Sequence, residues 1–166
     1  MPFIMQISGY SNSGKTTLLT HIIRRLSSEG LRVAVIKHDG GHDFELDQTG
    51  KDTWQFKEAG APLVAIQSKT KTAWLDYSPV ELPELINRIS TGIPDIILIE
   101  GFKYADYPKI VLIRREEDKE LLHKLTQIIA IASWLPMKAD SLPVYSIHDQ
   151  EKICELILDR YRLSFL

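Results

Sequence analysis

The sequence has little cysteine, little net charge and no long hydrophobic run, and each shortage excludes a class of protein. Cys154 is its single cysteine, so no internal disulfide can form and a reducing compartment is favoured. A formal net charge of −2 offers no general basic field for nucleic acid. No apolar run approaches the roughly 20 residues that span a bilayer, and the N-terminus lacks the marks of a signal peptide. We therefore expect a cytoplasmic protein that binds neither nucleic acid nor a membrane, with Cys154 buried in a helix.

Short apolar segments alternate with helical patterns along the chain. Strands are predicted at 3–8, 32–37, 63–67, 72–77, 96–99, 109–114 and 128–132. Helices are predicted from Leu18 to Leu26, over 51–59, from a capping box that begins at Ser78, between 114 and 128, and after Asp149. The run 96–99 is apolar throughout, which is typical of a central strand in a parallel sheet covered on both faces. The alternation predicts an α/β fold with a doubly wound, mostly parallel sheet and helices on both faces.

Residues 9–16 read Gly-Tyr-Ser-Asn-Ser-Gly-Lys-Thr, which fits the phosphate-binding pattern G-x-x-x-x-G-K-[ST]. Glycine at 9 permits the sharp turn out of a strand, and glycine at 14 lets backbone N–H groups approach an anion. Lysine adds a positive charge, and the threonine hydroxyl is a ligand for Mg²⁺. The alternative is an ordinary glycine-rich turn with a surface lysine. We predict one P-loop NTPase-like nucleotide-binding domain over 1–166, whose contacts to the nucleotide include Gly9, Ser11, Asn12, Ser13, Gly14, Lys15, Thr16 and Thr17.

A P-loop site also needs an acid that holds Mg²⁺ or orients water. Glu100 directly follows the apolar strand 96–99, and Asp47 lies in the long polar loop after the strand 32–37. Both are candidate catalytic residues, and together with Thr16 they are candidate metal ligands. The alternatives are a carboxylate satisfied by neighbouring backbone for Glu100 and an ordinary loop residue for Asp47. We expect Asp95, at the other end of the strand, to be a solvated strand start.

The loop from 38 to 49 is rich in charged and imidazole side chains. Lys37 and His38 are candidate contacts to the nucleotide. His38 and His42 lie four residues apart with Asp39 and Asp43 beside them, which leaves open a transition-metal site or a simple polar loop.

The sequence gives little indication of which nucleotide base is bound, because the guanine-recognition pattern N-K-x-D is absent. Its nearest approach, Met137-Lys-Ala-Asp140, lacks the asparagine. An acidic residue after the strand 128–132 would suit guanine, and this chain has Trp134 there.

Several segments together resemble the MobB family of molybdopterin-guanine dinucleotide biosynthesis proteins. The resemblance rests on the P-loop 9–17, on Lys37-His-Asp-Gly-Gly-His42 followed by Asp47-Gln-Thr-Gly-Lys-Asp52, on Ala59-Gly-Ala61, and on Ile99-Glu-Gly-Phe-Lys103 with Pro108-Lys109. It implies a GTP- and Mg²⁺-binding accessory protein with weak GTP hydrolysis, which assists a MobA-type nucleotidyltransferase. It also implies a homodimer, and it makes molybdopterin a further candidate ligand. His38, Lys51, Asp52 and Lys103 become candidate loop contacts.

Two other functions remain open at this stage. A small-molecule kinase would need an arginine-rich lid, and the mixed-charge segment 114–119 is a poor match for one. A metal-insertion chaperone with a nucleotide switch would need a richer set of histidines. The predicted strand 72–77, which carries Trp74 and Tyr77, would need to be covered, and pairing with a second chain is one way.

Overall fold

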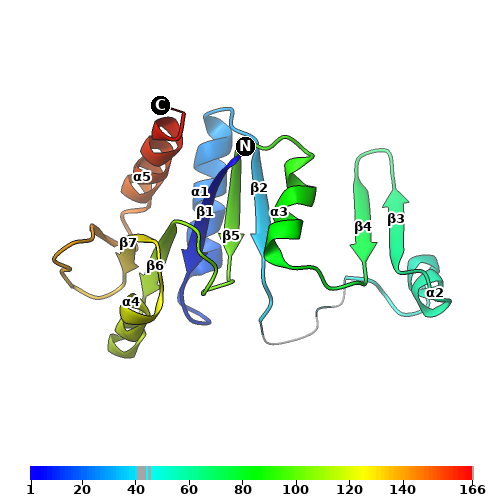
Figure 1. Ribbon diagram of the computed structural model, residues 1–166, viewed down its shortest axis with the longest axis horizontal. Coiled ribbons are helices and arrows are strands. Elements are labelled where there is room, and N and C mark those ends of the chain that lie inside the picture. The colour runs from blue at the N-terminus through cyan, green and yellow to red at the C-terminus, as the bar shows by residue number, and fades with distance from the viewer. Residues whose placement is uncertain (41–43, 45, 166) are drawn as a thin grey trace.

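A computed structural model of the chain describes residues 1–40, 44 and 46–165. Six parallel strands form its main sheet in the order β2-β5-β1-β6-β7-β8 (Figure 1). Their bounds are β1 Phe3–Ser8, β2 Val33–Lys37, β5 Ile96–Glu100, β6 Lys109–Ile113, β7 Ile128–Ser133 and β8 Val144–Ser146. The α/β fold with a parallel sheet is confirmed. Strand β8 was not predicted, because three residues are too few for a periodic signal.

Helices cover both faces of this sheet. On one face lie α1 (Lys15–Ser28) and α5 (Gln150–Leu163), and on the other lie α3 (Leu82–Ser90) and the turn formed by η1 (Glu116–Glu120) and α4 (Leu121–Lys124). Alternate residues of one strand therefore enter different cores. Leu98 packs with α1 and α5, whereas Ile97 and Ile99 pack with α3. Burial of both faces explains why β5 is apolar throughout.

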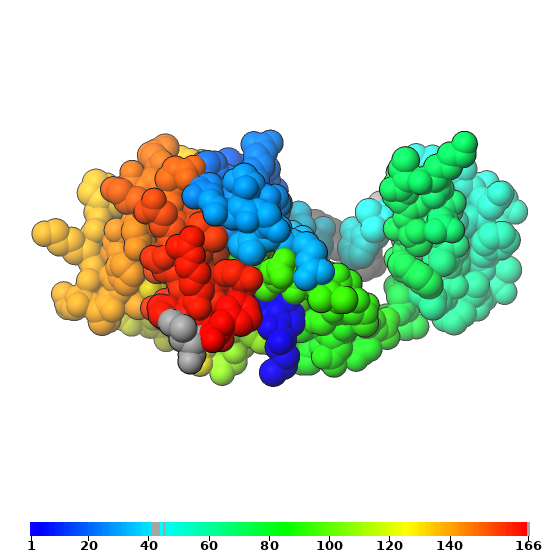
Figure 2. All heavy atoms as spheres, turned by 90° about the horizontal axis from the view of Figure 1, so that it is seen from above, coloured from blue at the N-terminus to red at the C-terminus, as the bar shows by residue number. Residues whose placement is uncertain are grey.

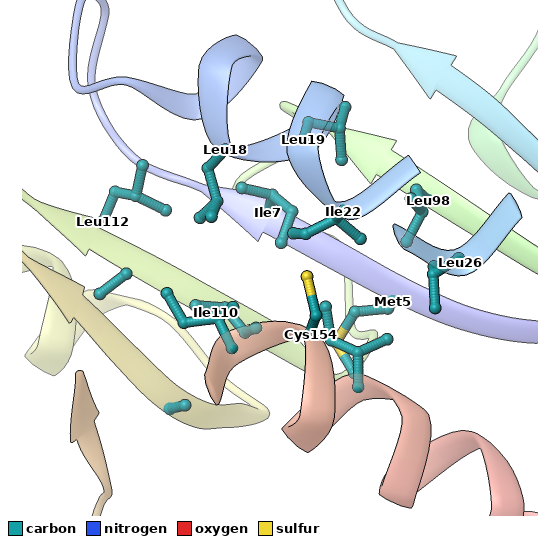
Figure 3. Packing of buried hydrophobic residues seen from close by; sticks show 14 of the residues in the cluster. Met5, Ile7, Leu18, Leu19, Ile22, Leu26, Leu98, Ile110, Leu112 and Cys154 are labelled. Atoms are coloured by element: carbon teal, nitrogen blue, oxygen red, sulfur yellow. The ribbon is translucent and has the colours of Figure 1, made fainter. Parts of the chain in front are cut away.

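Cys154 occupies the core between α5 and the sheet, beside Met5 (Figure 3). Its side chain is fully buried, as predicted. Burial raises the pKa of the thiol to about 11. The thiol is therefore protonated at neutral pH and serves as a small apolar group of the core.

The start of α3 differs from the prediction. The pattern beginning at Ser78 indicated a helix there, but α3 begins at Leu82 with Glu81 in extended backbone as its N-cap residue. The amide of Ser78 instead donates to Oδ1 of Asp76 at 2.9 Å, which closes a turn at the end of the preceding strand. Pro83 stands in the first turn of the helix, where its missing N–H costs nothing.

A separate arm is formed by α2 (Asp52–Glu58), β3 (Leu63–Gln67) and β4 (Thr72–Asp76). The two strands pair antiparallel in a sheet of their own, and the arm stands to one side of the main sheet and its helices (Figure 2). An ion pair between Arg88 of α3 and Asp76 joins it to the body. We call these residues, 52–76, the arm. Both strands were predicted, but their separation from the main sheet was not.

Large apolar side chains are exposed on the arm. Leu63, Ile66 and Trp74 are 52 %, 53 % and 69 % exposed, and Val64 is buried. A two-stranded hairpin is marginally stable by itself, so these side chains leave apolar area that a further surface would cover. Across the described residues, no helix is long and apolar enough to cross a membrane.

Alanine variants of Gly101 and Gly30 are expected to differ measurably in their free energy of unfolding. The φ of Gly101 is +92°, and a Cβ there would lie 2.8 Å from Cβ and 3.1 Å from the carbonyl oxygen of His38. Gly30 has φ +82° with nothing within 4 Å of the same position, so it is a matched control. Both alanine variants incur a left-handed backbone cost of about 1–2 kcal/mol. We expect Gly101→Ala to lose roughly 1–3 kcal/mol more, because it also creates a clash. Urea unfolding measures both, and equal losses would contradict the close approach.

Candidate functional site

A cavity of about 1680 Å³ opens at the carboxyl ends of the central strands. Its walls come from the P-loop after β1, from 37–40 at the end of β2, from 81–83 at the start of α3, from 100–107 at the end of β5, and from side chains that follow β6 and β7. Ligands of open parallel sheets bind at this edge. The predicted contacts Gly9, Ser11, Asn12, Ser13, Gly14, Lys15, Thr16, Thr17, Lys37 and His38 all line this cavity, as does Glu100.

The P-loop has the backbone of an anion cradle. Asn12 and Gly14 have φ of +59° and +96°, and α1 begins directly after Gly14. Left-handed residues in such a turn aim successive N–H groups at one point, where the helix dipole adds positive charge. A Cβ on Gly9 would lie 2.7 Å from Oγ of Ser13, so this turn requires glycine. Oγ of Ser13 is buried with no hydrogen-bond partner among the described residues.

Lys15 reaches back across this loop. Its Nζ donates to the carbonyl oxygen of Tyr10 at 2.8 Å. Burial lowers the pKa of Lys15, and the carboxylate of Glu100 opposes that effect. A bound anion would strengthen this opposing effect and favour the charged amine.

Thr16 and Glu100 meet at the edge of the cavity next to β5. Oγ1 of Thr16 donates to the two carboxylate oxygens of Glu100 at 3.2 and 3.3 Å. Glu100 is 7 % exposed at the end of β5, as its place in the sequence predicted. A threonine hydroxyl beside a carboxylate is an all-oxygen set of the kind that Mg²⁺ prefers when phosphates and waters complete its shell. The residues present therefore fit a nucleotide-bound Mg²⁺.

Asp47 lies away from this pair. One oxygen of its carboxylate accepts from the amide of Gln48 at 2.9 Å and from Oγ1 of Thr53 at 2.7 Å, and the other accepts from the Tyr77 hydroxyl at 3.4 Å. It is not among the residues that line the cavity. The structure does not bring Asp47 to Thr16 and Glu100, because the start of α2 engages its carboxylate. Its predicted metal-binding and catalytic roles receive no support from this arrangement.

His38 is fixed against the end of β5. Its amide donates to the carbonyl oxygen of Glu100 at 2.9 Å, and its ring lies 4.4 Å from that of Phe102. The predicted companions His42 and Asp43 lie outside the described residues. Over the described ranges, no group of three or more histidine, cysteine or acidic residues is arranged to hold a metal ion.

Two buried polar side chains support the cavity wall, a role that the sequence did not predict for either of them. Gln6 donates through Nε2 to the carbonyl oxygens of Gly101 and Phe102, both at 2.6 Å. Lys109 donates through Nζ to those of Ala105 at 2.7 Å and Thr126 at 2.8 Å, and burial lowers its pKa. Together they hold the segment 101–107. A polar residue within an otherwise apolar strand was the available signal.

Trp134 and Arg114 contact the P-loop from the other side. Nε1 of Trp134 donates to the carbonyl oxygen of Ser13 at 2.9 Å, and a guanidinium N–H of Arg114 donates to that of Asn12. The guanidinium lies over the indole at 5.5 Å from its centroid. Asp140 is exposed and does not line the cavity. From the sequence, Trp134 was noted only because an acidic residue at its position would suit guanine.

The chain is similar to known proteins over most of its length. The family model described as "Molybdopterin guanine dinucleotide synthesis protein B" matches residues 4–134. A relative from Haemophilus influenzae, a "Molybdopterin-guanine dinucleotide biosynthesis adapter protein", is 38 % identical over 82 % of this chain and 78 % of its own. A protein of the same description from Escherichia coli is 32 % identical over 94 % and 91 %.

Solved structures agree with this relationship. Bacillus subtilis MobB has a TM-score of 0.82 and 32 % identity, over 96 % of this chain and 97 % of its own. A MobB homologue from Bacillus stearothermophilus has a TM-score of 0.76 and 26 % identity, over 96 % and 98 %. The chain therefore belongs to the MobB family of molybdopterin-guanine dinucleotide biosynthesis adapter proteins.

Proposed function

We propose that this protein binds GTP with Mg²⁺, hydrolyses it slowly, and in that state assists a MobA-type nucleotidyltransferase that makes molybdopterin-guanine dinucleotide in the cytoplasm. The contact between Thr16 and Glu100 at the mouth of the P-loop carries the proposal. A hydroxyl and a carboxylate at this edge would hold a magnesium ion beside bound phosphates, where the ion would neutralise negative charge. The partner, the pterin and the guanine base are proposed from the family, and the site supports the binding of phosphates with Mg²⁺.

Slow hydrolysis fits the charges around the cavity. Arg114 is engaged by the carbonyl oxygen of Asn12, and the short 3₁₀ turn after it contains mixed charges. No described segment forms an arginine-rich lid of the sort a small-molecule kinase closes over its substrates. The metal-chaperone alternative gains no support from the described residues, which hold no group of three or more histidine, cysteine or acidic side chains arranged for a metal ion.

Lys15→Ala is expected to weaken GTP binding at least about tenfold, because it removes a charge-assisted contact to the phosphates. Calorimetry in Mg²⁺, with GTP and ATP side by side, measures the effect. Lys152→Ala is the matched control, since Lys152 is an exposed lysine that forms an ion pair with Asp149. Equal binding by wild type and Lys15→Ala would place the nucleotide elsewhere. Equal or stronger binding of ATP would remove the guanine assignment.

Glu100→Gln is expected to lower the GTP hydrolysis rate at least about tenfold and to raise the Mg²⁺ concentration needed for half-maximal binding. The amide can still accept a hydrogen bond from Thr16, so the variant removes charge with little change in shape. Asp47→Asn, measured in parallel, decides whether the second predicted acid reaches the metal. If only Asp47→Asn lowered the GTP hydrolysis rate, the metal would be assigned to the loop that contains Asp47, and the role of Glu100 would be contradicted.

We also propose that the exposed apolar side chains of the arm pair with those of a second copy. Leu63 and Trp74 lie on the same face of a short hairpin and leave apolar area there, which a two-fold axis would bury on both copies at once, whereas Ile66 is exposed on the other face.

Trp74→Arg is expected to shift the protein to a monomer in sedimentation velocity at micromolar concentration, because a charge would be buried unpaired in that contact. Ile93→Arg is the control, since Ile93 is similarly exposed, at 66 %, but lies on the turn before β5. A monomeric wild type would remove the proposed dimer.

A further inference from the structure

The order of the strands fixes the direction in which a bound nucleotide would lie. Thr16 and Glu100 mark the metal end of the phosphates on the β5 side of β1. Strands β6 and β7 lie on the opposite side of β1. A nucleoside whose β- and γ-phosphates point toward Glu100 therefore extends over the carboxyl ends of β6 and β7.

Trp134 is the first residue after β7, and its ring is held on several sides. Its Nε1 is bonded to the carbonyl oxygen of Ser13 at 2.9 Å. Its Cζ2 lies 3.3 Å from where a Cβ would sit on Gly14, so the six-membered ring contacts the start of α1. His148 meets it edge-on, with centroids 5.4 Å apart and planes at 82°. A ring fixed in this way loses little conformational entropy when a ligand stacks on it.

Despite these contacts, Trp134 is 43 % exposed and lines the cavity. For an indole side chain this exposure leaves roughly 100 Å² of accessible surface, comparable with one face of a purine. Stacking on an aromatic ring is available to any base, so the ring can supply affinity but not the choice between guanine and adenine.

The charges beside Trp134 are positive. Among the described residues that line the cavity, those from the ends of β6 and β7 are Arg114, Arg115 and Trp134. The carboxylates of the cavity wall come from the other segments, at Asp39, Glu81, Glu100 and Asp106. Among the described residues, no carboxylate is therefore supplied from this side for the N1–H and N2 donors of guanine. Its O6 and N7 are acceptors, which a guanidinium can engage together, whereas adenine presents a donor at position 6.

Arg114 and Arg115 differ in their availability. Arg114 is engaged by the carbonyl oxygen of Asn12 and lies over Trp134. The guanidinium of Arg115 is exposed at the cavity wall, with no hydrogen bond or ion pair to any residue that the structure describes.

We propose that Trp134 is the stacking platform for the nucleotide base, and that Arg115 selects guanine through O6 and N7. This inference rests on the proposed binding of GTP at the P-loop. Arg114 acts as a positioning residue that holds the indole and the loop together. Recognition is thereby moved from the N1 and N2 edge of guanine to the opposite edge.

Nucleotide analogues distinguish recognition of guanine through O6 and N7 from recognition through N1 and N2. ITP keeps O6 and N7 but lacks the 2-amino group, so we expect its affinity to lie within about twofold of that of GTP, with ATP at least about tenfold weaker. A site that reads N2 with an acceptor would bind ITP much more weakly than GTP. Such a loss would overturn the proposal.

Fluorescence reports the stacking directly. In the Trp54→Phe/Trp74→Phe background Trp134 is the sole tryptophan. Its emission is expected to be quenched by GTP and ITP and to be unchanged by inorganic triphosphate at saturation. Quenching of equal size by triphosphate would show that the ring senses phosphate binding alone, and would contradict the platform.

Variants complete the test. By calorimetry, Trp134→Ala is expected to weaken GTP about tenfold more than it weakens inorganic triphosphate, Trp134→Phe to retain most of the GTP affinity, and Arg115→Ala to reduce the preference for GTP over ATP. Should Trp134→Ala fail to fold, the phenylalanine variant and the single-tryptophan titration still decide. GTP binding that is lost in Lys15→Ala but unchanged in Trp134→Ala would overturn this inference and leave the proposed function intact. A wild type that binds no nucleotide would overturn both.

Discussion

The parallel pairing of β1 with β5 is the constraint on which the site depends. In this register Ile7 is opposite Glu100, so the turn out of β1 and the carboxylate that ends β5 reach the same edge of the sheet. The P-loop then turns back into α1, and Thr16 in its first turn meets that carboxylate. Parallel strands need covered faces, and α1, α3 and α5 provide the cover while forming the cores that fix the register. The proposed phosphate and metal sites are therefore both consequences of one strand alignment.

Buried polar side chains carry this alignment into the cavity wall. Gln6 and Lys109 sit on the two neighbouring strands β1 and β6 and donate to four carbonyl oxygens, three of which belong to the segment 101–107. Buried donors without partners are costly, so these bonds fix where that segment can lie. Because Gly101 has no Cβ, the chain at His38 can pack directly against it. Contacts beneath the cavity wall therefore fix its position beside Glu100.

Two surfaces lie beside this central alignment: the arm, and the part of the cavity wall formed by Arg114, Arg115 and Trp134, which we call the base side. The arm has its own small sheet, exposes large apolar side chains, and draws Asp47 into hydrogen bonds at the start of α2. The base side carries an indole and two guanidinium groups where a carboxylate would suit guanine. In the proposals above, the arm forms the contact between two copies of the chain, and the base side selects the nucleotide. The P-loop at the end of the central strands, which lies between these two surfaces, would hold the phosphates.

The sequence by itself determined the P-loop, the parallel α/β fold, the burial of Cys154 and the place of Glu100, because each depends on a local pattern or on a strand's apolar content. Tertiary structure decided the rest. Only the fold could separate the hairpin from the main sheet, move the start of α3 from Ser78 to Leu82, or show that Gln6 and Lys109 support the same segment. It alone placed Glu100 beside Thr16 and left Asp47 elsewhere. Which carboxylate reaches a metal, and which ring a base can stack on, depends on residues more than 80 positions apart in the chain, and no local periodicity encodes such a contact.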